Sequence, residues 1–221
     1  MIKVNILSTE DLRGIKASDN KETLVDLKKV CPKVRFRIGA YVSLNGSHED
    51  VVAASYAREG IAKRLNKAQG FLPKGYRILV VCAYRSPLLQ QRIFENIKQE
   101  LIQEYLTWTN KQIEKEMDNR VSPPDVGPHC CGGAIDITII DSSGKQLNMG
   151  TKFSEFGEKT FTDSMLVSVD VKRNRALLKE VMEKAGFVNF PAEWWHWSYG
   201  DREWAYHQKN KIAIYDLITK E

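Results

Sequence analysis

Two short segments of this chain carry the side chains that most constrain its fold. One runs from His129 to Asp136 and reads His-Cys-Cys-Gly-Gly-Ala-Ile-Asp, and the other is the tetrapeptide Glu-Trp-Trp-His at 193–196. Imidazole nitrogens and carboxylate oxygens are zinc ligands, and a catalytic zinc ion has three protein ligands and one position for water. A fold in which both segments serve one ion must bring them together from distant parts of the chain.

The two segments divide into ligands and a base. His129, Asp136 and His196 supply two imidazoles and one carboxylate, a ligand set typical of catalytic zinc. Glu193 is a spare carboxylate beside the last imidazole, where it is suited to take a proton from a metal-activated water. The pattern predicts a hydrolase with one zinc ion (Zn2+) per chain.

Length and composition predict one domain. The chain has 221 residues, 43% of them hydrophobic, without an internal repeat or linker. We expect residues 1–35 to form a peripheral N-terminal segment and residues 207–221 a C-terminal tail. No apolar run has the length of a transmembrane helix, and the N-terminus lacks the features of a signal peptide. The expected location is cytoplasmic, or periplasmic if the N-terminus has been trimmed.

Charge and cysteine content limit the classes of binding partner and the cellular location that we expect for this chain. The net charge is +5, but Lys and Arg are interleaved with Asp and Glu, so we expect no nucleic-acid partner and no membrane partner. A mild positive field favours an anionic substrate such as a peptide carboxylate or a cell-wall fragment. Cys82 lies in an apolar run and is expected to be buried. Cys130 and Cys131 are interpreted as packing residues beside the site, although thiolates also bind metals. Reduced thiols, with Cys31 as the fourth, agree with a cytoplasmic location.

Hydrophobic periodicity predicts an α+β fold with a small antiparallel sheet flanked by helices. The segment up to about residue 46 reads as irregular and partly extended, with strand-like alternation at 34–38. Expected helices cover 49–68, 87–117 and 173–185, and expected strands cover 76–84, 133–140 and 192–199. Ser86 and Pro87 predict the start of the long helix, and Gly186 predicts the end of the last one.

Each candidate also has an ordinary structural interpretation. The segment at 193–197 can be an aromatic core strand with one satisfied histidine. Glu193 argues against that, because a carboxylate among indoles needs a metal, a partner or a raised pKa. Arg85 follows an apolar strand, where its guanidinium can donate to a developing oxyanion or form an ordinary salt bridge. His48 and His207 lie in polar stretches and are expected to be solvated.

Several ordered motifs together carry a family resemblance. Arg85 after a strand, the motif His-x-x-Gly-x-Ala-x-Asp at 129–136 and the Glu-Trp-Trp-His box resemble the vancomycin-resistance-type D-alanyl-D-alanine dipeptidases of peptidase family M15. The likeness covers residues 36–206 and includes flanking stretches at 83–90, 148–151, 174–178 and 197–201. These zinc D,D-peptidases share a fold with lysostaphin-type endopeptidases and the hedgehog signalling domain.

The resemblance implies a hedgehog- and D,D-peptidase-like zinc peptidase fold and a role for each motif residue. His129, Asp136 and His196 would hold zinc. Glu193 would be the general base, and Arg85 would stabilise the tetrahedral intermediate. The implied reaction is hydrolysis of D-Ala-D-Ala by a zinc-activated water, and the implied substrate is a small D-amino-acid peptide of cell-wall metabolism.

The chain departs from the family around the substrate. Gly127 and Cys130 occupy positions where the family usually has Ser, either two residues before the first zinc His or directly after it. Dipeptidases commonly carry an Asp after Met-Gly-x-x-Phe that holds the substrate's ammonium group, whereas this chain has Ser154 followed by Glu155. The aromatic partner of that ammonium group, usually Tyr, aligns with Ile38.

These departures leave the substrate open. We expect Ser154, Glu155, Gly127 and Tyr84 to contact the substrate; either Glu155 replaces the missing Asp, or the enzyme accepts longer peptides. The same-class alternative is a D,D- or L,D-carboxypeptidase that trims D-Ala from peptidoglycan stem peptides. The alternative of a different class is a non-catalytic zinc-containing binding module, which the presence of both Glu193 and Arg85 disfavours. The sequence gives no indication of oligomeric state.

Overall fold

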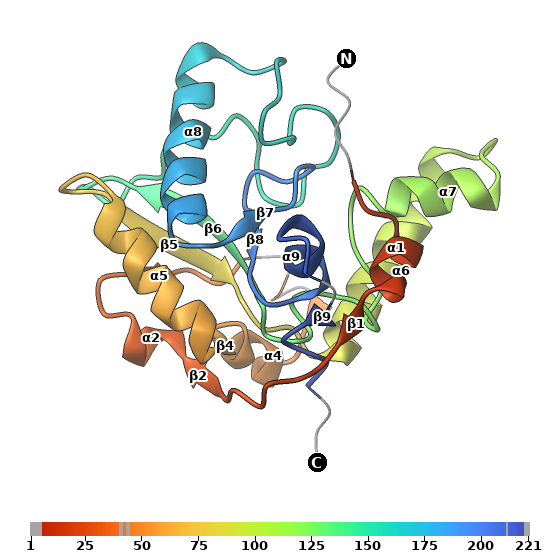
Figure 1. The fold of residues 1–221 in the computed structure, drawn as a ribbon. Helices are drawn as coiled ribbons and strands as arrows, with labels where there is room; N and C mark the ends of the chain where they lie inside the picture. The colour runs from red at the N-terminus through yellow and green to blue at the C-terminus, as the bar shows by residue number, and fades with distance from the viewer. Residues whose placement is uncertain (1–5, 40–41, 43–44, 211, 219–221) are drawn as a thin grey trace.

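A five-stranded sheet forms the centre of the molecule (Figure 1). The computed structural model describes residues 6–39, 42, 45–210 and 212–218. In spatial order the strands are β3 (Arg35–Phe36), β5 (Arg77–Cys82), β6 (Ala134–Ile140), β8 (His196–Ser198) and β7 (Val188–Asn189). Neighbouring strands run antiparallel except at one edge, where β3 pairs with β5 in parallel. The predicted α+β class is confirmed, with one parallel pair added to the expected antiparallel sheet.

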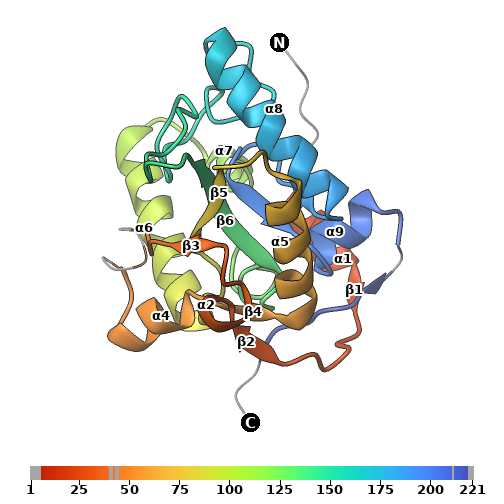
Figure 2. The same cartoon turned by 90° about the vertical axis from the view of Figure 1, so that its left-hand side faces the viewer.

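The middle strand, β6, has two chemically different faces. Ile135, Ile137 and Ile139 belong to the main hydrophobic core, whereas Asp136 and Thr138 alternate with them, and all seven strand residues are buried. Successive side chains of a strand point to opposite faces of a sheet. The core face packs against α5 (Glu59–Phe71) and α8 (Val169–Lys184), while α6 (Pro87–Glu104) lies on the other side (Figure 2). The polar positions of β6 therefore face away from α5 and α8.

Short elements surround this centre. They are α1 (Thr9–Gly14), β1 (Lys16–Ala17), β2 (Leu24–Asp26), α2 (Leu27–Val30), α4 (His48–Ala53), β4 (Tyr56–Arg58), α7 (Asn110–Met117), α9 (Arg202–His207) and β9 (Ile212–Ala213). Two further pairs of strands form, β1 with β9 in parallel and β2 with β4 antiparallel. The expected strand at 34–38 is reduced to β3, and Leu27, Cys31 and Val34 join the main core.

The single helix expected at 49–68 is wrong. The structure has α4, then β4, then α5 over this stretch. Strand β4 pairs with β2, and the Ala54 and Tyr56 carbonyls accept hydrogen bonds from the Ala83 and Tyr84 amides. Pairing with distant segments has overridden the helical periodicity of the apolar residues.

The single helix expected at 87–117 is also wrong, because it ends at Glu104 and α7 starts at Asn110. Thr109 caps α7 in a capping box with Gln112, a helix-start signal inside the apolar pattern. The Tyr105 and Trp108 rings stack between the two helices, with centroids 3.8 Å apart. The start at Ser86 is confirmed, since its side chain accepts a hydrogen bond from the Leu89 amide.

The C-terminal elements differ from expectation in their bounds. Helix α8 starts at Val169, before the expected residue 173, and ends before Gly186, which has a φ of +93° as expected of a C-terminal cap. The strand expected at 192–199 covers only His196–Ser198. Glu193 therefore lies in the turn before β8, where its carbonyl accepts a hydrogen bond from the His196 amide. Within the described residues, no helix combines the length and apolarity needed to span a membrane.

All four cysteines are buried, as predicted for Cys82, and none of them forms a disulfide. His48 and His207 are exposed, as expected.

A buried acid occurs in the first turn of α9: the side chain of Glu203 is 9% exposed and lies 4.0 Å from His207 Nε2. Burial, together with the charge of Asp201, raises the pKa of Glu203 to about 8.

We predict that Glu203→Gln stabilises the protein in a pH-dependent way. The folded chain holds a proton on Glu203 that the unfolded chain releases above its ordinary pKa of 4.5, so stability falls as the pH rises from 4.5 to about 8. The variant lacks this loss and should be more stable at pH 8 by roughly 1–3 kcal/mol, with the difference vanishing near pH 4. Urea denaturation across this range measures it, with the exposed Glu180→Gln as control. A difference independent of pH would contradict the assignment.

Candidate metal centre

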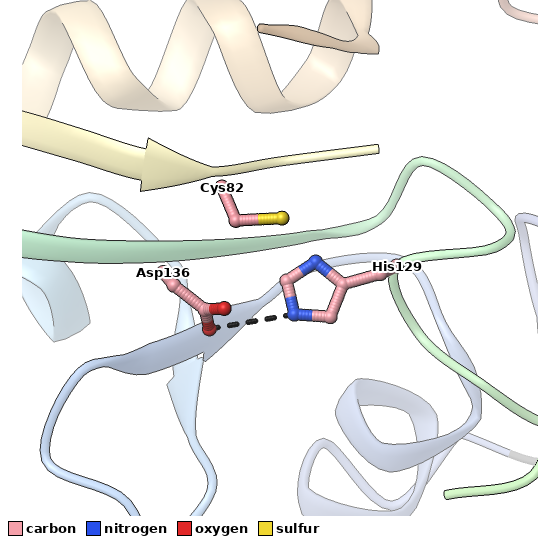
Figure 3. Close-up of side chains that lie close together, drawn as sticks. All are labelled: Cys82, His129 and Asp136. Atoms are coloured by element: carbon pink, nitrogen blue, oxygen red, sulfur yellow. Dashed lines mark ion pairs between the residues drawn. The ribbon is translucent and has the colours of Figure 1, made fainter. Parts of the chain in front are cut away.

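Three neighbouring strands bring chemically active side chains onto one face of the sheet. In register, Asp136 on β6 lies opposite Cys82 at the end of β5 and opposite His196 at the start of β8. Directly opposite residues of paired strands share a face. This is the face away from α5 and α8, and Figure 3 shows the Cys82 side chain pointing toward the gap between Asp136 and His129.

His129 reaches the same place from the loop before β6. The loop turns at Gly132, which has a φ of +72°, and a Cβ there would lie 2.7 Å from Leu24 Cδ2. A Cβ on Gly133 would lie 2.9 Å from the Tyr199 carbonyl oxygen. Both positions therefore need glycine. The buried Arg58 fastens the loop by donating from Nε to the Cys131 carbonyl at 2.9 Å.

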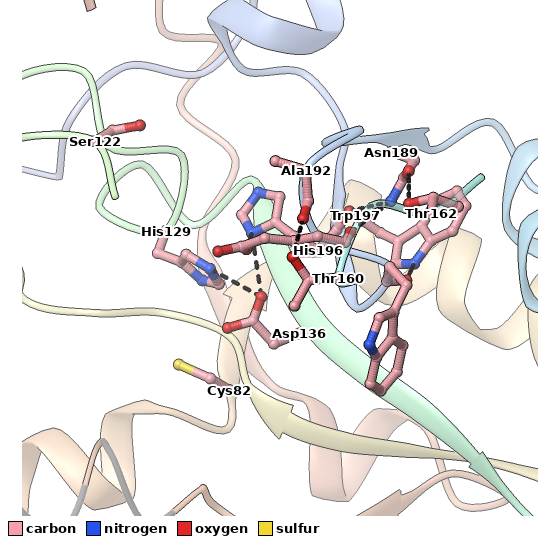
Figure 4. A network of polar contacts seen from close by, with 12 residues as sticks. Cys82, Ser122, His129, Asp136, Thr160, Thr162, Asn189, Ala192, His196 and Trp197 are labelled. Atoms are coloured by element: carbon pink, nitrogen blue, oxygen red, sulfur yellow. Dashed lines mark hydrogen bonds and ion pairs between the residues drawn. The ribbon is translucent and has the colours of Figure 1, made fainter. Parts of the chain in front are cut away.

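Both predicted histidine ligands approach one oxygen of Asp136. Asp136 Oδ1 lies 3.3 Å from His129 Nε2 and 3.1 Å from His196 Nδ1 (Figure 4). Zinc bonds to nitrogen and oxygen of about 2.0–2.1 Å place ligand atoms about 3.3 Å apart in a tetrahedron. Glu193 Oε2 lies farther out, 4.0 Å from His196 Nδ1. Each predicted histidine ligand thus lies next to Asp136, and the ligand atoms within 4.8 Å of one another form two groups that share Asp136, one with Cys82 and His129 and one with Glu193 and His196.

The tautomer of His129 leaves one nitrogen for a metal. Its Nδ1 is hydrogen-bonded to the Ala83 carbonyl, so Nδ1 carries the proton. Its Nε2 is buried and has no hydrogen-bond donor or acceptor among the described residues. Burial lowers the pKa of His129 to about 4, so the ring is neutral at neutral pH. A neutral imidazole whose other nitrogen donates to a carbonyl has the geometry of a metal ligand.

Arg85 joins the site through Asp136. Its terminal nitrogen lies 2.7 Å from Asp136 Oδ2, and its second nitrogen donates to Gln90 Oε1 at 3.3 Å. Gln90 in turn donates to the Ser122 carbonyl at 2.7 Å, which links Arg85 to the loop that carries His129. Burial opposes ionisation of Asp136, but His129, where its ring is protonated, and the permanent charge of Arg85 outweigh it and hold the pKa of Asp136 well below its ordinary value. The carboxylate is thus charged and oriented.

Glu193 is a buried acid next to this charge. It is 8% exposed. Hydrogen bonds to its backbone hold it in place, and one of them is donated by the Asn189 side chain to the Glu193 carbonyl at 3.0 Å. Burial, reinforced by the charge of Asp136, raises the pKa of Glu193 well above its ordinary value. Trp194 and Trp197 pack beneath the turn, with their indole nitrogens hydrogen-bonded to Thr151 and to the Trp194 carbonyl. The tryptophans are core residues that hold the turn.

The site opens into a cavity, and only some of the predicted substrate contacts belong to its wall. Its wall includes the five predicted metal-site and catalytic residues together with Ser154, Phe156, Phe190, Ile93, Ile97, Asp118, Glu203, Leu7, Thr9 and Leu12. Of the predicted contacts, Ser154 lines the cavity, whereas Glu155, Gly127 and Tyr84 are not part of its wall. Glu155 accepts a hydrogen bond from the Lys152 amide at 3.0 Å. Ile38 packs in a hydrophobic cluster with Leu89 and Ile93.

Close packing explains why residue 127 is a glycine. A Cβ at this position would lie 3.2 Å from the Pro123 carbonyl oxygen and 3.3 Å from Cys130 Sγ. The two departures from the family, Gly127 and Cys130, therefore occupy one tightly packed spot. Gln90 belonged to the flanking stretch at 83–90 of the family resemblance but was given no role. Sequence reasoning missed Glu203 and the N-terminal residues of the cavity wall, because none of them belongs to a recognisable motif.

Solved structures show weak overall similarity to this chain. The LdcB LD-carboxypeptidase, in a structure that reports peptidoglycan recognition, is 20% identical with a TM-score of 0.46, covering 91% of this chain and 82% of that chain. A variant of the vancomycin-resistance D,D-pentapeptidase VanY in complex with Zn(II) is 17% identical with a TM-score of 0.40, covering 70% and 80%.

Sequence comparison gives a clearer result. A D-alanyl-D-alanine dipeptidase from Synechocystis sp. is 31% identical over 196 residues, covering 73% of this chain and 78% of the relative. The D-alanyl-D-alanine dipeptidase of Escherichia coli is 41% identical over 68 residues, covering 31% and 35%. The family model described as D-ala-D-ala dipeptidase matches residues 20–214, nearly the whole chain. The chain therefore belongs to the D-Ala-D-Ala dipeptidase family of M15 peptidases.

Proposed function

We propose that this protein is a zinc peptidase that hydrolyses the dipeptide D-Ala-D-Ala. The observation that carries the proposal is the convergence of two imidazoles on one oxygen of Asp136, with the buried acid Glu193 beside them. Family membership and the names of the curated relatives support the substrate. His129, Asp136 and His196 would hold the ion, which, when bound, supplies an activated water and polarises the substrate carbonyl.

Glu193 is placed to move protons during the reaction. Its buried carboxyl group, beside the negative charge of Asp136, has a high affinity for a proton, which favours accepting one from the attacking water. The same group then holds the proton that the leaving amine requires. Because Glu193 lies in a turn fixed by Asn189 and by the tryptophan packing, little reorientation of its side chain is needed between these two events.

Arg85 stabilises negative charge on the substrate side. Its guanidinium is held by Asp136 and Gln90, so the plane of its donors is fixed before substrate enters. A guanidinium stays charged at all relevant pH values and offers its donors in a rigid fork. The Arg85 side chain is 10% exposed, and donors in such a shielded place stabilise an oxyanion more than they would in water.

A carboxypeptidase that trims D-Ala from longer stem peptides is the second candidate. Two observations favour it: Ser154 stands in the cavity wall at the position where dipeptidases commonly carry Asp, and the cavity extends from the metal site to Ile93 and Ile97 on α6. Comparing the free dipeptide with a five-residue peptide ending in D-Ala-D-Ala separates the two, since a dipeptidase prefers the former.

We predict that Glu193→Ala keeps zinc and loses activity. The substitution removes the proton acceptor but none of the three ligands, so zinc content by mass spectrometry should remain near one per chain. Turnover of D-Ala-D-Ala should fall by about 10²–10⁴-fold. Glu158→Ala, an exposed carboxylate outside the cavity wall, is the control. Undiminished hydrolysis by Glu193→Ala would contradict the role of Glu193 as proton acceptor.

We predict that Arg85→Lys lowers kcat although the positive charge is kept. An ammonium group lacks the fork that bridges Asp136 and Gln90, so the remaining donor is no longer aimed at the oxyanion. Steady-state kinetics should show a fall in kcat of about 10–100-fold. The exposed Arg92→Lys on the next helix is the matched control. Equal kcat in Arg85→Lys and the parent would show that Arg85 only neutralises Asp136.

A further inference from the structure

Residues 7–17, here called the strap, line the active-site cavity although they precede the part of the chain that the family model matches. That match begins at residue 20. Leu7, Thr9 and Leu12 nevertheless form part of the cavity wall together with the metal-site residues. The strap was expected to be peripheral, so this contribution to the site calls for an account of its own.

One end of the strap is fixed to the α7 side of the cavity. Thr9 donates to Asp118 Oδ1 from its amide at 2.9 Å and from its hydroxyl at 2.8 Å. Leu7 and Leu12 are buried in a small cluster with Val126, in the loop that leads to His129. Helix α1 has only six residues and a capping box at Ser8, so these tertiary contacts supply most of what keeps it in place.

The other end is fixed to the α9 side. Arg202 Nε, at the start of α9, donates to the Ile15 carbonyl at 3.1 Å. Strand β1 then pairs with β9, and the Ser18 amide donates to the Ala213 carbonyl at 2.9 Å. In Figure 1 the chain runs from α1 into β1, which lies beside β9. The strap thus bridges two sides of the cavity.

We propose, on the basis of the function proposed above, that the strap limits the length of peptide that the site accepts. A peptide bond at the metal site must lie inside the cavity, and each further residue adds about 3.3–3.6 Å of extended chain. A longer peptide running toward the strap has to displace Leu7 and Leu12 from their cluster and return their apolar surface to water. The free dipeptide D-Ala-D-Ala meets no such obstacle. The strap therefore selects dipeptides over stem peptides.

Two variants of the full-length chain loosen the strap, and one serves as a matched control. Asp118→Ala removes the acceptor of both Thr9 hydrogen bonds, and Leu12→Ala truncates one of the three residues of the cluster that Leu7, Leu12 and Val126 form. Thr109→Ala deletes a similar capping interaction at the other end of α7 without touching the strap. Hydrogen exchange of the amides at 9–17 reports whether the strap has opened.

The readout is the ratio of kcat/KM for a five-residue peptide ending in D-Ala-D-Ala to kcat/KM for the free dipeptide. The parent should favour the dipeptide, and both loosened variants should raise the ratio by about tenfold or more, with no change in Thr109→Ala. An unchanged ratio in a variant whose strap exchanges faster would overturn the proposal. So would a parent that prefers the longer peptide.

Binding separates failure of the strap proposal from failure of the proposed function. A zinc-loaded parent that hydrolyses neither peptide refutes the proposed function. The strap is then tested by calorimetry, as the ratio of the Kd values of the two peptides in the Glu193→Ala background. Asp118→Ala should lower the Kd of the longer peptide relative to that of the dipeptide, and a constant ratio would reject the strap as a length determinant.

Discussion

The ionised carboxylate of Asp136, buried in the middle of the sheet, is the constraint on which the site depends. A buried charge is tolerated only when partners compensate for its lost hydration. Here one oxygen faces two imidazoles and the other faces Arg85. Each partner arrives from a different segment, so the loop before β6, the end of β5 and the start of β8 are all drawn to one point.

The strand that carries this charge also builds the core. Because side chains alternate along β6, the same residues that place Asp136 toward the cavity place Ile135 and Ile137 between the sheet and α5 and α8. Site and core are consequently fixed by one register. A slip of β6 by one residue would bury the carboxylate among isoleucines and turn apolar side chains toward the imidazoles.

The elements that were predictable from sequence are those with strong local patterns. Strands β5 and β6 follow apolar runs, and the predicted metal ligands lie in motifs that are recognisable in the sequence. The helix expected at 49–68 failed because Tyr56 pairs with a segment that is distant in sequence, and the long helix failed because the capping box at Thr109 lay inside an apolar pattern. Glu193 was placed on a strand because Trp-rich runs resemble strands, although hydrogen bonding makes that stretch a turn. No local sequence pattern marked Glu203 or the strap, because their roles arise only from contacts with residues that are distant in sequence.

Through the guanidinium of Arg58, the position of the loop that carries His129 depends on segments near both ends of the chain. Besides the Cys131 carbonyl, this guanidinium donates to the carbonyls of Glu22 and Asp216, and the Ile218 amide donates to the Cys130 carbonyl. The segments around Glu22 and Asp216, which are separated by most of the sequence, therefore hold the loop in place. The sheet itself is held by the hydrogen bonds between its strands. Local unfolding of either segment should release the loop of His129 before the strands separate. The proposed affinity for zinc would therefore depend on local order in segments that are remote from the site in sequence.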